Sequence, residues 1–344
     1  MAHIWVPKLK IHEVGISTPP GKVEGYYMLE TVNRYGRVTR RLGPWRQVVT
    51  DLQMDDTFYF PNAGGSGGPH GRCTVGTGSP VFTPASTGLA NPVASTTTTY
   101  TWSNSIDTVG TDGYRETHLV TKEFALGAIT ANLTEVGMFS ANNNTSGRFL
   151  DLIRDSDGDP TTFPVTSDDQ LRVTHIVYRY PTLDTFAGSF VIGGSAGSGT
   201  HDYELNMAGL GSSTGTGSGA GGTFGCANNS AQVWNCYALR DCSALGTFLD
   251  QNPIGAVDLG AQSSFSGGNL GTDSNDGTVW RRTKTFTWGL TAANHANGIS
   301  GFKFGAPSQF NRCYKMIVDP PIPKFAGSVQ RILSIEFTIG ITRP

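Results

Sequence analysis

Residues 121–127 read TKEFALG, and residues 283–289 repeat the pattern as TKTFTWG. The two stretches start 162 residues apart, which is close to half of the 344-residue chain. Three more pairs recur at nearly this offset: residues 25–29 with 188–192, 148–153 with 312–317, and 170–179 with 332–341. Self-similarity at a fixed long period is typical of repeated structural units. We therefore expect two similar units in tandem, 1–181 and 182–344, although short apolar motifs also recur by chance in β-proteins.

The pair formed by residues 170–179 and 332–341 has the clearest secondary-structure pattern. Apolar side chains fall on every second residue of the later segment: Leu333, Ile335, Phe337, Ile339 and Ile341. Strict alternation of this kind places one set of side chains on the buried face of a strand. The earlier segment fills the same places with Leu171, Val173, His175 and Val177. His175 therefore aligns with Phe337, and we interpret it as a core aromatic residue rather than a catalytic base.

The composition favours an all-β chain that is rich in loops. Glycine accounts for 45 of the 344 residues, and charged residues make up 15% of the chain, below the usual share of about a quarter. No stretch of ten or more residues has convincing helical periodicity. Such a composition disfavours helices and favours short strands joined by tight turns. We predict two β-sandwich or barrel-like units, with a Gly/Ser-rich loop at residues 211–225 in the second unit.

The net charge of −2 gives no indication of nucleic-acid binding. One basic cluster lies in a predicted hairpin with its turn at residues 33–36: Arg34, Arg37, Arg40, Arg41 and Arg46. A nucleic-acid patch would be denser and interleaved with aromatic residues. We therefore expect a strand that faces solvent or another subunit.

The absence of a recognisable targeting signal and the odd number of cysteines lead us to expect a protein that folds inside a cell. Residues 1–6 lack the basic and long apolar regions of a signal peptide, and no run of eighteen apolar residues suggests a membrane span. The five cysteines are Cys73, Cys226, Cys236, Cys242 and Cys313. An odd number argues against a complete set of disulfides, and the middle three are spaced too widely for a zinc site. We expect structural thiols; a disulfide formed after release and a metal site are the alternatives.

The one metal-like motif is DSDGD at residues 155–159, with Asp155, Asp157 and Asp159 as candidate calcium ligands. Alternating carboxylates suit a hard cation. However, the glycine comes at the fourth position instead of the sixth, and position twelve is Thr166 instead of glutamate. Asp and Gly are also the residues that build tight turns. We favour a hairpin turn and keep calcium as the alternative.

The sequence offers little for catalysis. Its G-x-S-x-G matches, at residues 64–68, 193–197 and 211–215, fall in Gly/Ser-rich runs and not in a strand-turn-helix elbow, and its histidines are scattered. No phosphate- or dinucleotide-binding glycine loop follows a strand and opens a helix. Paired carboxylates for glycoside hydrolysis can lie far apart in sequence, but no acidic residue stands out in both copies. We expect no enzyme activity, no cofactor and no resident metal.

Residues 73–139 resemble the N-terminal attachment domain of phage tail-collar fibre proteins. The family pattern V-G-x-G corresponds to residues 75–78, L-x-N to residues 89–91, and I-x-E-I-G-L-F to LTEVGMF at residues 133–139. With a closing segment at residues 153–180, the resemblance covers roughly 105 residues, and its motifs are short. In the second copy, residues 296–302 keep only the Ile and Phe positions. The resemblance implies a structural rather than a catalytic role for five motif residues: Gly76, Gly78, Glu135, Gly137 and Phe139.

The resemblance implies a phage virion protein of the tail, collar or baseplate that is made in the cytoplasm of the bacterial host. Its expected partners are further copies of itself and other tail or neck proteins, without nucleic acid or membrane insertion. One alternative is a receptor-binding adhesin or tail spike that recognises a host-surface glycan or protein. Aromatic residues near loops would serve that role, although packing on strand faces is the commoner explanation for them: Tyr100, Trp102, Tyr114 and Trp234. A capsid decoration protein is a further alternative.

Overall fold

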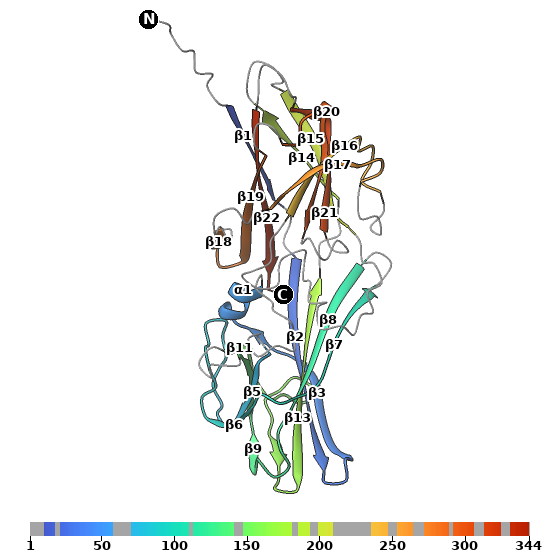
Figure 1. Ribbon diagram of the computed structural model, residues 1–344. Helices are drawn as coiled ribbons and strands as arrows, with labels where there is room; N and C mark the ends of the chain where they lie inside the picture. Colours follow the sequence, from blue (N-terminus) through green and yellow to red (C-terminus); the bar gives the residue numbers. More distant parts are fainter. Residues whose placement is uncertain are drawn as a thin grey trace, which may run out of the picture. The chain divides into compact units, whose positions relative to one another are not determined.

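The computed structural model describes residues 10–17, 21–57, 70–109, 113–140, 147–180, 185–192, 199–208, 235–246, 253–263, 272–288, 292–305, 313–324 and 331–343. These residues are almost entirely β-structure, as the composition predicts, with several sheets and one helix of seven residues (Figure 1). No helix in these ranges has the length and apolar character of a membrane span. The glycine-rich segment 211–225 lies outside the described residues.

The chain forms two compact units. The N-terminal unit comprises residues 21–181, 214–223 and 341–344, and the C-terminal unit comprises residues 1–20, 182–213 and 224–340. Among the described residues, the predicted division into 1–181 and 182–344 therefore differs from the observed one at residues 10–17 and 341–343. The strand β1 (Lys10–Ser17) pairs in parallel with β22 (Arg331–Thr342), at the other end of the chain. Parallel strands are not joined by a hairpin turn. The sequence near residues 10–17 therefore has no turn signal that would identify β22 as their partner.

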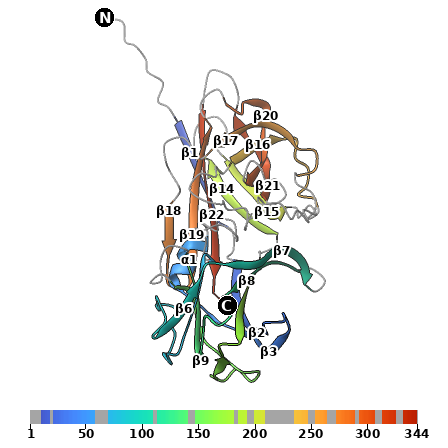
Figure 2. The same ribbon diagram turned by 60° about the horizontal axis from the view of Figure 1, so that its bottom comes forward.

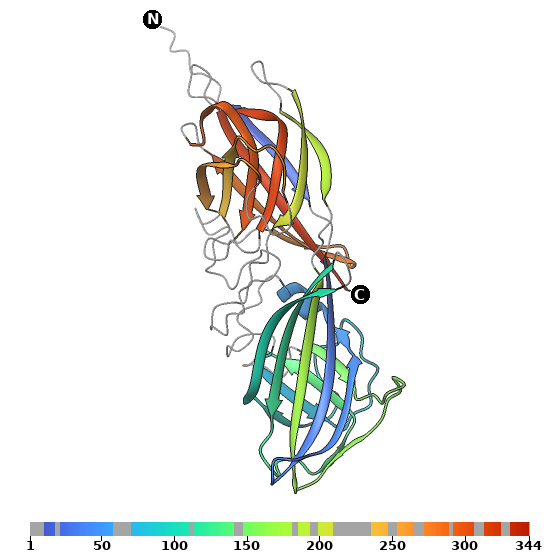
Figure 3. The ribbon, with the colours of Figure 1, turned by 90° about the vertical axis from the view of Figure 1, so that its right-hand side faces the viewer.

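The N-terminal unit is a sandwich of two antiparallel sheets. The first has the order β3 (Val38–Arg46), β2 (Gly21–Asn33), β13 (Asp169–Tyr180), β8 (Gly113–Glu123), β7 (Thr99–Val109). The second has the order β4 (Val48–Val49), β11 (Gly147–Leu152), β10 (Glu135–Phe139), β5 (Arg72–Gly76), β6 (Pro92–Thr96). Figure 3 shows the long strands of the first sheet in front of the shorter strands of the second.

Two small elements complete the N-terminal unit. The strands β9 (Ala131–Leu133) and β12 (Phe163–Val165) pair with each other. The helix α1 (Asp51–Thr57) packs against β11. Thr50 caps this helix, because its Oγ1 accepts a hydrogen bond of 3.2 Å from the Gln53 backbone N–H.

The C-terminal unit is also a two-sheet sandwich. One sheet has the order β1, β22, β19 (Val279–Trp288), β18 (Thr272–Asn275). The other has the order β14 (Phe186–Ile192), β15 (Gly199–Ala208), β21 (Cys313–Lys324), β20 (His295–Gly305), β16 (Asn235–Arg240), β17 (Val257–Ser263). Figure 2 shows β14 and β15 beside β21 in this second sheet. None of the sheets among the described strands closes into a barrel.

The two units share a strand order. In the N-terminal unit, β13-β8-β7 faces β4-β11-β10-β5-β6; in the C-terminal unit, β22-β19-β18 faces β15-β21-β20-β16-β17. Eight strands of one unit thus correspond to eight strands of the other, both in their order along the chain and in their positions within the two sheets. Three of the four sequence pairs fall on corresponding strands: β8 with β19, β11 with β21, and β13 with β22. The pair 25–29 and 188–192 is wrong, because β2 and β14 lie in sheets of different type; β1 takes the place of β2.

The predicted alternation is confirmed where the side chains are described. Leu171, Val173, His175 and Val177 are buried on β13, as are Leu333, Ile335 and Phe337 on β22. The aromatic residue Phe337 stacks on Phe304 of the opposite sheet, with ring centroids 4.1 Å apart. In the N-terminal unit His175 meets Phe149 across the sandwich at 4.3 Å. Both cores are therefore closed by an aromatic contact between the two sheets.

Candidate functional site

Three of the five motif residues, Gly76, Gly78 and Glu135, gather around the start of β10, in the middle of the second sheet of the N-terminal unit. Glu135 is fully buried and lies directly opposite Gly76 of β5. Gly137 and Phe139 follow it on β10, and both are buried. Gly76, Gly78 and Glu135 thus form one site, built from β10, from β5 and from the loop that follows β5, and Gly137 and Phe139 extend from it along β10.

The Glu135 carboxylate accepts three backbone hydrogen bonds. Its Oε1 accepts one from Gly78 N at 3.1 Å and one from Asn91 N at 2.7 Å, and its Oε2 accepts one from Ala90 N at 2.9 Å. Hydrogen bonds to a carboxylate are stronger than neutral ones, and a buried acid needs such donors to offset its lost hydration. We call this group the Glu135 clamp: Gly76, Gly78, Ala90, Asn91 and Glu135.

The glycines of the clamp are required by space. A Cβ on Gly78 would lie 2.7 Å from Glu135 Oε1 and 2.8 Å from the Cβ of Ala90. A Cβ on Gly76 would collide with the same Oε1. Gly137 leaves room in a similar way, because a Cβ there would lie 2.6 Å from Leu150 Cδ2. The glycines let a large carboxylate lie within the sheet and reach the loop.

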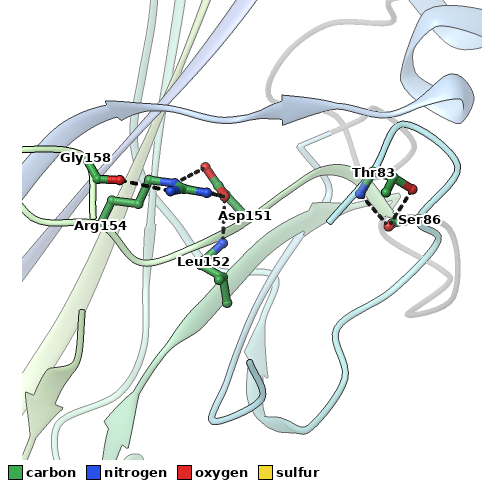
Figure 4. Close-up of polar contacts among 6 residues, drawn as sticks. All are labelled: Thr83, Ser86, Asp151, Leu152, Arg154 and Gly158. Carbon is green, nitrogen blue, oxygen red and sulfur yellow. Dashed lines mark hydrogen bonds and ion pairs between the residues drawn. The ribbon is translucent and has the colours of Figure 1, made fainter. Parts of the chain in front are cut away.

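Neighbouring contacts hold the loop of residues 77–91 from both ends. Thr77 N donates to Asn91 O at 3.0 Å, and Thr134 Oγ1 donates to Gly78 O at 2.5 Å. Farther along, the Thr83 backbone N–H donates to Ser86 Oγ at 2.9 Å and forms a tight turn (Figure 4). The clamp therefore fixes a long surface loop to the core of the sheet.

The C-terminal unit has a smaller version of this arrangement. After β16, the strand that corresponds to β5, the Cys242 backbone N–H donates to Ser300 Oγ of β20 at 2.8 Å. Here the Ser300 hydroxyl accepts one backbone hydrogen bond, where the Glu135 carboxylate accepts three. Gly301 beside it is again tightly packed, since its Cβ would lie 2.8 Å from Cys242 Sγ. The same junction is thus fastened more weakly in the second copy.

A second polar group lies in the core of the N-terminal unit, around His175. Its Nε2 faces the Gln47 side-chain amide nitrogen, and its Nδ1 lies 3.0 Å from His70 Nδ1. Burial lowers the pKa of His175 to about 3. The ring is therefore neutral at physiological pH, as the interpretation of His175 as a core aromatic requires.

The described thiols are free and lie in or near the cores. Cys73 and Cys236 are buried and Cys242 is half-buried. Burial raises the pKa of each of these thiols, which makes them poor nucleophiles. Cys226 and the side chain of Cys313 lie outside the described residues.

Lys122, the lysine of the TKEFALG stretch, is buried beside Cys73. Its Nζ donates to Gly71 O at 3.2 Å, to Thr97 O at 3.1 Å and to Thr99 Oγ1 at 2.8 Å. Burial lowers its pKa. These three acceptors use all three ammonium hydrogens, so this lysine fastens the loops at the end of the sheet.

The aspartate motif forms a turn. Asp155 Oδ1 accepts hydrogen bonds from the backbone N–H groups of Asp157 and Asp159, each at 3.0 Å. Gly158 adopts a positive φ of 88°, which glycine tolerates best. Arg154 donates to Gly158 O at 2.9 Å and forms an ion pair of 3.1 Å with the buried Asp151 (Figure 4). Within the described ranges, no three His, Cys, Asp or Glu side chains gather as metal ligands would.

A hollow lies on the C-terminal unit, over β14, β15 and β21. Its volume is about 840 Å³. Its lining includes small residues of β14, the junction of Cys242 and Ser300, Tyr203 of β15, and three carboxylates: Asp202, Glu204 and Asp319. We call it the acidic groove.

Of the aromatic residues near loops, Tyr100 is half exposed, and the Arg172 guanidinium lies 3.8 Å from the centre of its ring. Trp102 is half-buried. The side chains of Tyr114 and Trp234 lie outside the described residues.

Sequence reasoning missed the Gln47–His70–His175 group and the acidic groove. Gln47 and His70 lie 128 and 105 residues before His175, and no local sequence pattern predicts such contacts.

No family model matches the chain, and no curated protein and no solved structure matches it.

Proposed function

We propose that the chain is a structural protein of a phage virion, located in the tail, collar or baseplate. In this role it assembles with copies of itself and docks to other virion proteins through its β-surfaces. The observation that carries the proposal is the Glu135 clamp. Three residues of the tail-fibre-like motif, Gly76, Gly78 and Glu135, hold a loop to a sheet, which suits a part that must keep its shape.

Two further properties support an assembly role. The strands β3 and β14 lie at the ends of their sheets and are largely exposed. Edge strands tend to pair with other chains unless they are covered, and identical copies are the simplest cover. The low charge and the abundance of glycine, serine and threonine suit a protein that must persist outside a cell.

The test is the location of the protein in purified particles. Mass spectrometry of the virion should detect the chain in several copies, and immunogold labelling should mark the tail or neck. A replication protein of the same phage, absent from particles, is the control. Absence from the virion would refute the proposal, and a label distributed over the capsid would favour the decoration protein instead.

A second experiment distinguishes a receptor-binding adhesin from a purely structural protein, by measuring whether the purified chain binds host cells. Purified protein that binds host cells and blocks infection would replace a purely structural role with receptor recognition. A structural component of the tail should do neither, even when it is labelled in the particle.

A further inference from the structure

The acidic groove carries uncompensated negative charge. Asp202 and Asp319 lie directly opposite each other on the antiparallel pair β15 and β21, an arrangement that is destabilising for like charges. Both side chains are exposed, as is Glu204 two residues along. No lysine or arginine lines the groove, and within the described residues no ion pair engages these three carboxylates. The groove is therefore suited to a cationic occupant.

The tip of the hairpin β2–β3 in the N-terminal unit carries the opposite charge. Its turn is closed by hydrogen bonds of 2.9 Å from Asn33 N to Arg37 O and from Gly36 N to Asn33 O. Tyr35 is 72% exposed at the tip, with the Arg34 guanidinium 5.0 Å from its ring centre. A hydrogen-bonded turn thus presents one exposed aromatic ring and two arginines, Arg34 and Arg37.

The remaining arginines of the hairpin already have partners. Arg41 forms an ion pair with Glu30, and Arg46 lies 3.8 Å from Glu24. Arg40 donates to Pro164 O at 2.9 Å. By contrast, Arg34 and Arg37 have no acidic partner among the described residues. The positive charge that is available to bind an acidic partner therefore lies at the hairpin tip, on Arg34 and Arg37.

We propose that the hairpin tip of one copy docks into the acidic groove of a second copy of this chain. Arg34 and Arg37 would pair with Asp202 and Asp319, which relieves the repulsion between the two aspartates, and Tyr35 would pack beside Tyr203. Guanidinium and carboxylate groups make strong, directional pairs, and a hollow of this volume is within the usual range of about 300–1,000 Å³ for ligand sites. Because groove and tip are different surfaces, the contact is head-to-tail and builds a ring or an open chain of copies.

This inference rests on the self-assembly in the proposed function and names the surfaces that carry it. It is tested with the full chain in three variants. The groove variant carries Asp202→Lys and Asp319→Lys, the tip variant carries Arg34→Glu and Arg37→Glu, and the swapped variant carries all four changes. A matched control, Asp168→Lys, reverses an exposed charge in another turn. All the replaced side chains are exposed, so circular dichroism and melting curves should match the wild type.

Sedimentation analysis at low salt is the readout. The wild type and the control should form multimers that dissociate as salt rises. The groove and tip variants alone should each associate about tenfold or more weakly. An equimolar mixture of the two should recover the multimer, because each then offers the charge that the other lacks, and the swapped variant should recover it alone.

A wild type that is monomeric at low salt would overturn the inference. Single-sided variants that keep the wild-type mass, or folded variants whose mixture shows no recovery, would also overturn it. The proposed function fails by a different result, namely absence of the chain from purified virions. A chain that is present in the tail and has the wild-type mass in every variant would refute this interface and leave the proposed function standing.

Discussion

His175 of β13 and Phe337 of β22 lie at corresponding places in the two units, and their surroundings differ in polarity. The ring of Phe337 lies against two others, with centroids 4.1 Å from Phe304 and 5.3 Å from Tyr314. His175 also lies against a ring, that of Phe149, but its two nitrogens face Gln47 and His70. One sandwich is therefore closed by an aromatic cluster and the other by an aromatic cluster with a polar network inside it.

The same contrast recurs where the strands β5 and β16 end. Glu135 takes three backbone donors in the N-terminal unit, and Ser300 takes one in the C-terminal unit. A buried polar network specifies geometry when every member is satisfied and is costly when one is lost. The comparison shows that one strand order tolerates either solution, and that the N-terminal unit depends more on individual polar residues.

The largest effect should come from removing β1. Deletion of residues 1–17 takes away an eight-residue parallel ladder with β22 and the buried Ile16. The C-terminal unit should lose its protected amides, whereas the N-terminal unit should keep them, because β2 fills the corresponding place there. Hydrogen exchange resolved by peptide measures both units in one sample.

The control for that deletion is removal of residues 1–9, which leaves β1 intact. If the longer deletion left exchange in β22 and β19 unchanged, the assignment of β1 to the C-terminal unit would be wrong.

Glu135→Ala should be the most destabilising single change considered. It leaves three backbone N–H groups without their acceptor, which should lower the free energy of unfolding by about 3–5 kcal/mol. The matched change Ser300→Ala removes one acceptor and should cost about 1 kcal/mol. Chemical denaturation of both variants gives the two values. Equal losses would contradict the difference drawn between the two junctions.

The pH dependence of stability should separate the two cores. The folded pKa of His175 is about 3, below the value of about 6.5 for an unfolded histidine. The unfolded state therefore binds more protons between these values. The stabilising contribution is complete above about pH 6.5 and is lost as the pH falls towards 3, by up to about 1.4 kcal/mol per pH unit.

His175→Phe copies the C-terminal core and should flatten the decrease in stability between pH 6.5 and 4.5. It should also cost about 1–3 kcal/mol at pH 7, because Gln47 loses its partner. The reciprocal change Phe337→His should make the C-terminal unit acid-sensitive. Denaturation at a series of pH values compares the slopes, with carboxylate titration common to all variants. A slope unchanged by His175→Phe would refute the role given to this histidine.

Local pattern was enough to predict much of the fold. The alternation in 170–179 and 332–341 identified buried faces, and the turn signals at residues 33–36 and 155–159 coincide with glycines of positive φ, Gly36 at 77° and Gly158 at 88°. The convergence of Gly76, Gly78 and Glu135 was anticipated only as a family motif, without its geometry. Contacts that join distant strands leave no periodic signal, which is why the pairing of β1, the partners of His175 and the acidic groove were missed.

The role assigned to Glu135 is tested most directly by the hydrogen-exchange rates of three backbone amides, those of Gly78, Ala90 and Asn91, in the full-length protein. If the carboxylate holds the loop 77–91 to the sheet, these three amides should exchange as slowly as the strands β5 and β10, and Glu135→Ala should release all three together. Exchange as fast as in an exposed turn in the wild-type protein would contradict the clamp, and with it the structural reading of the motif.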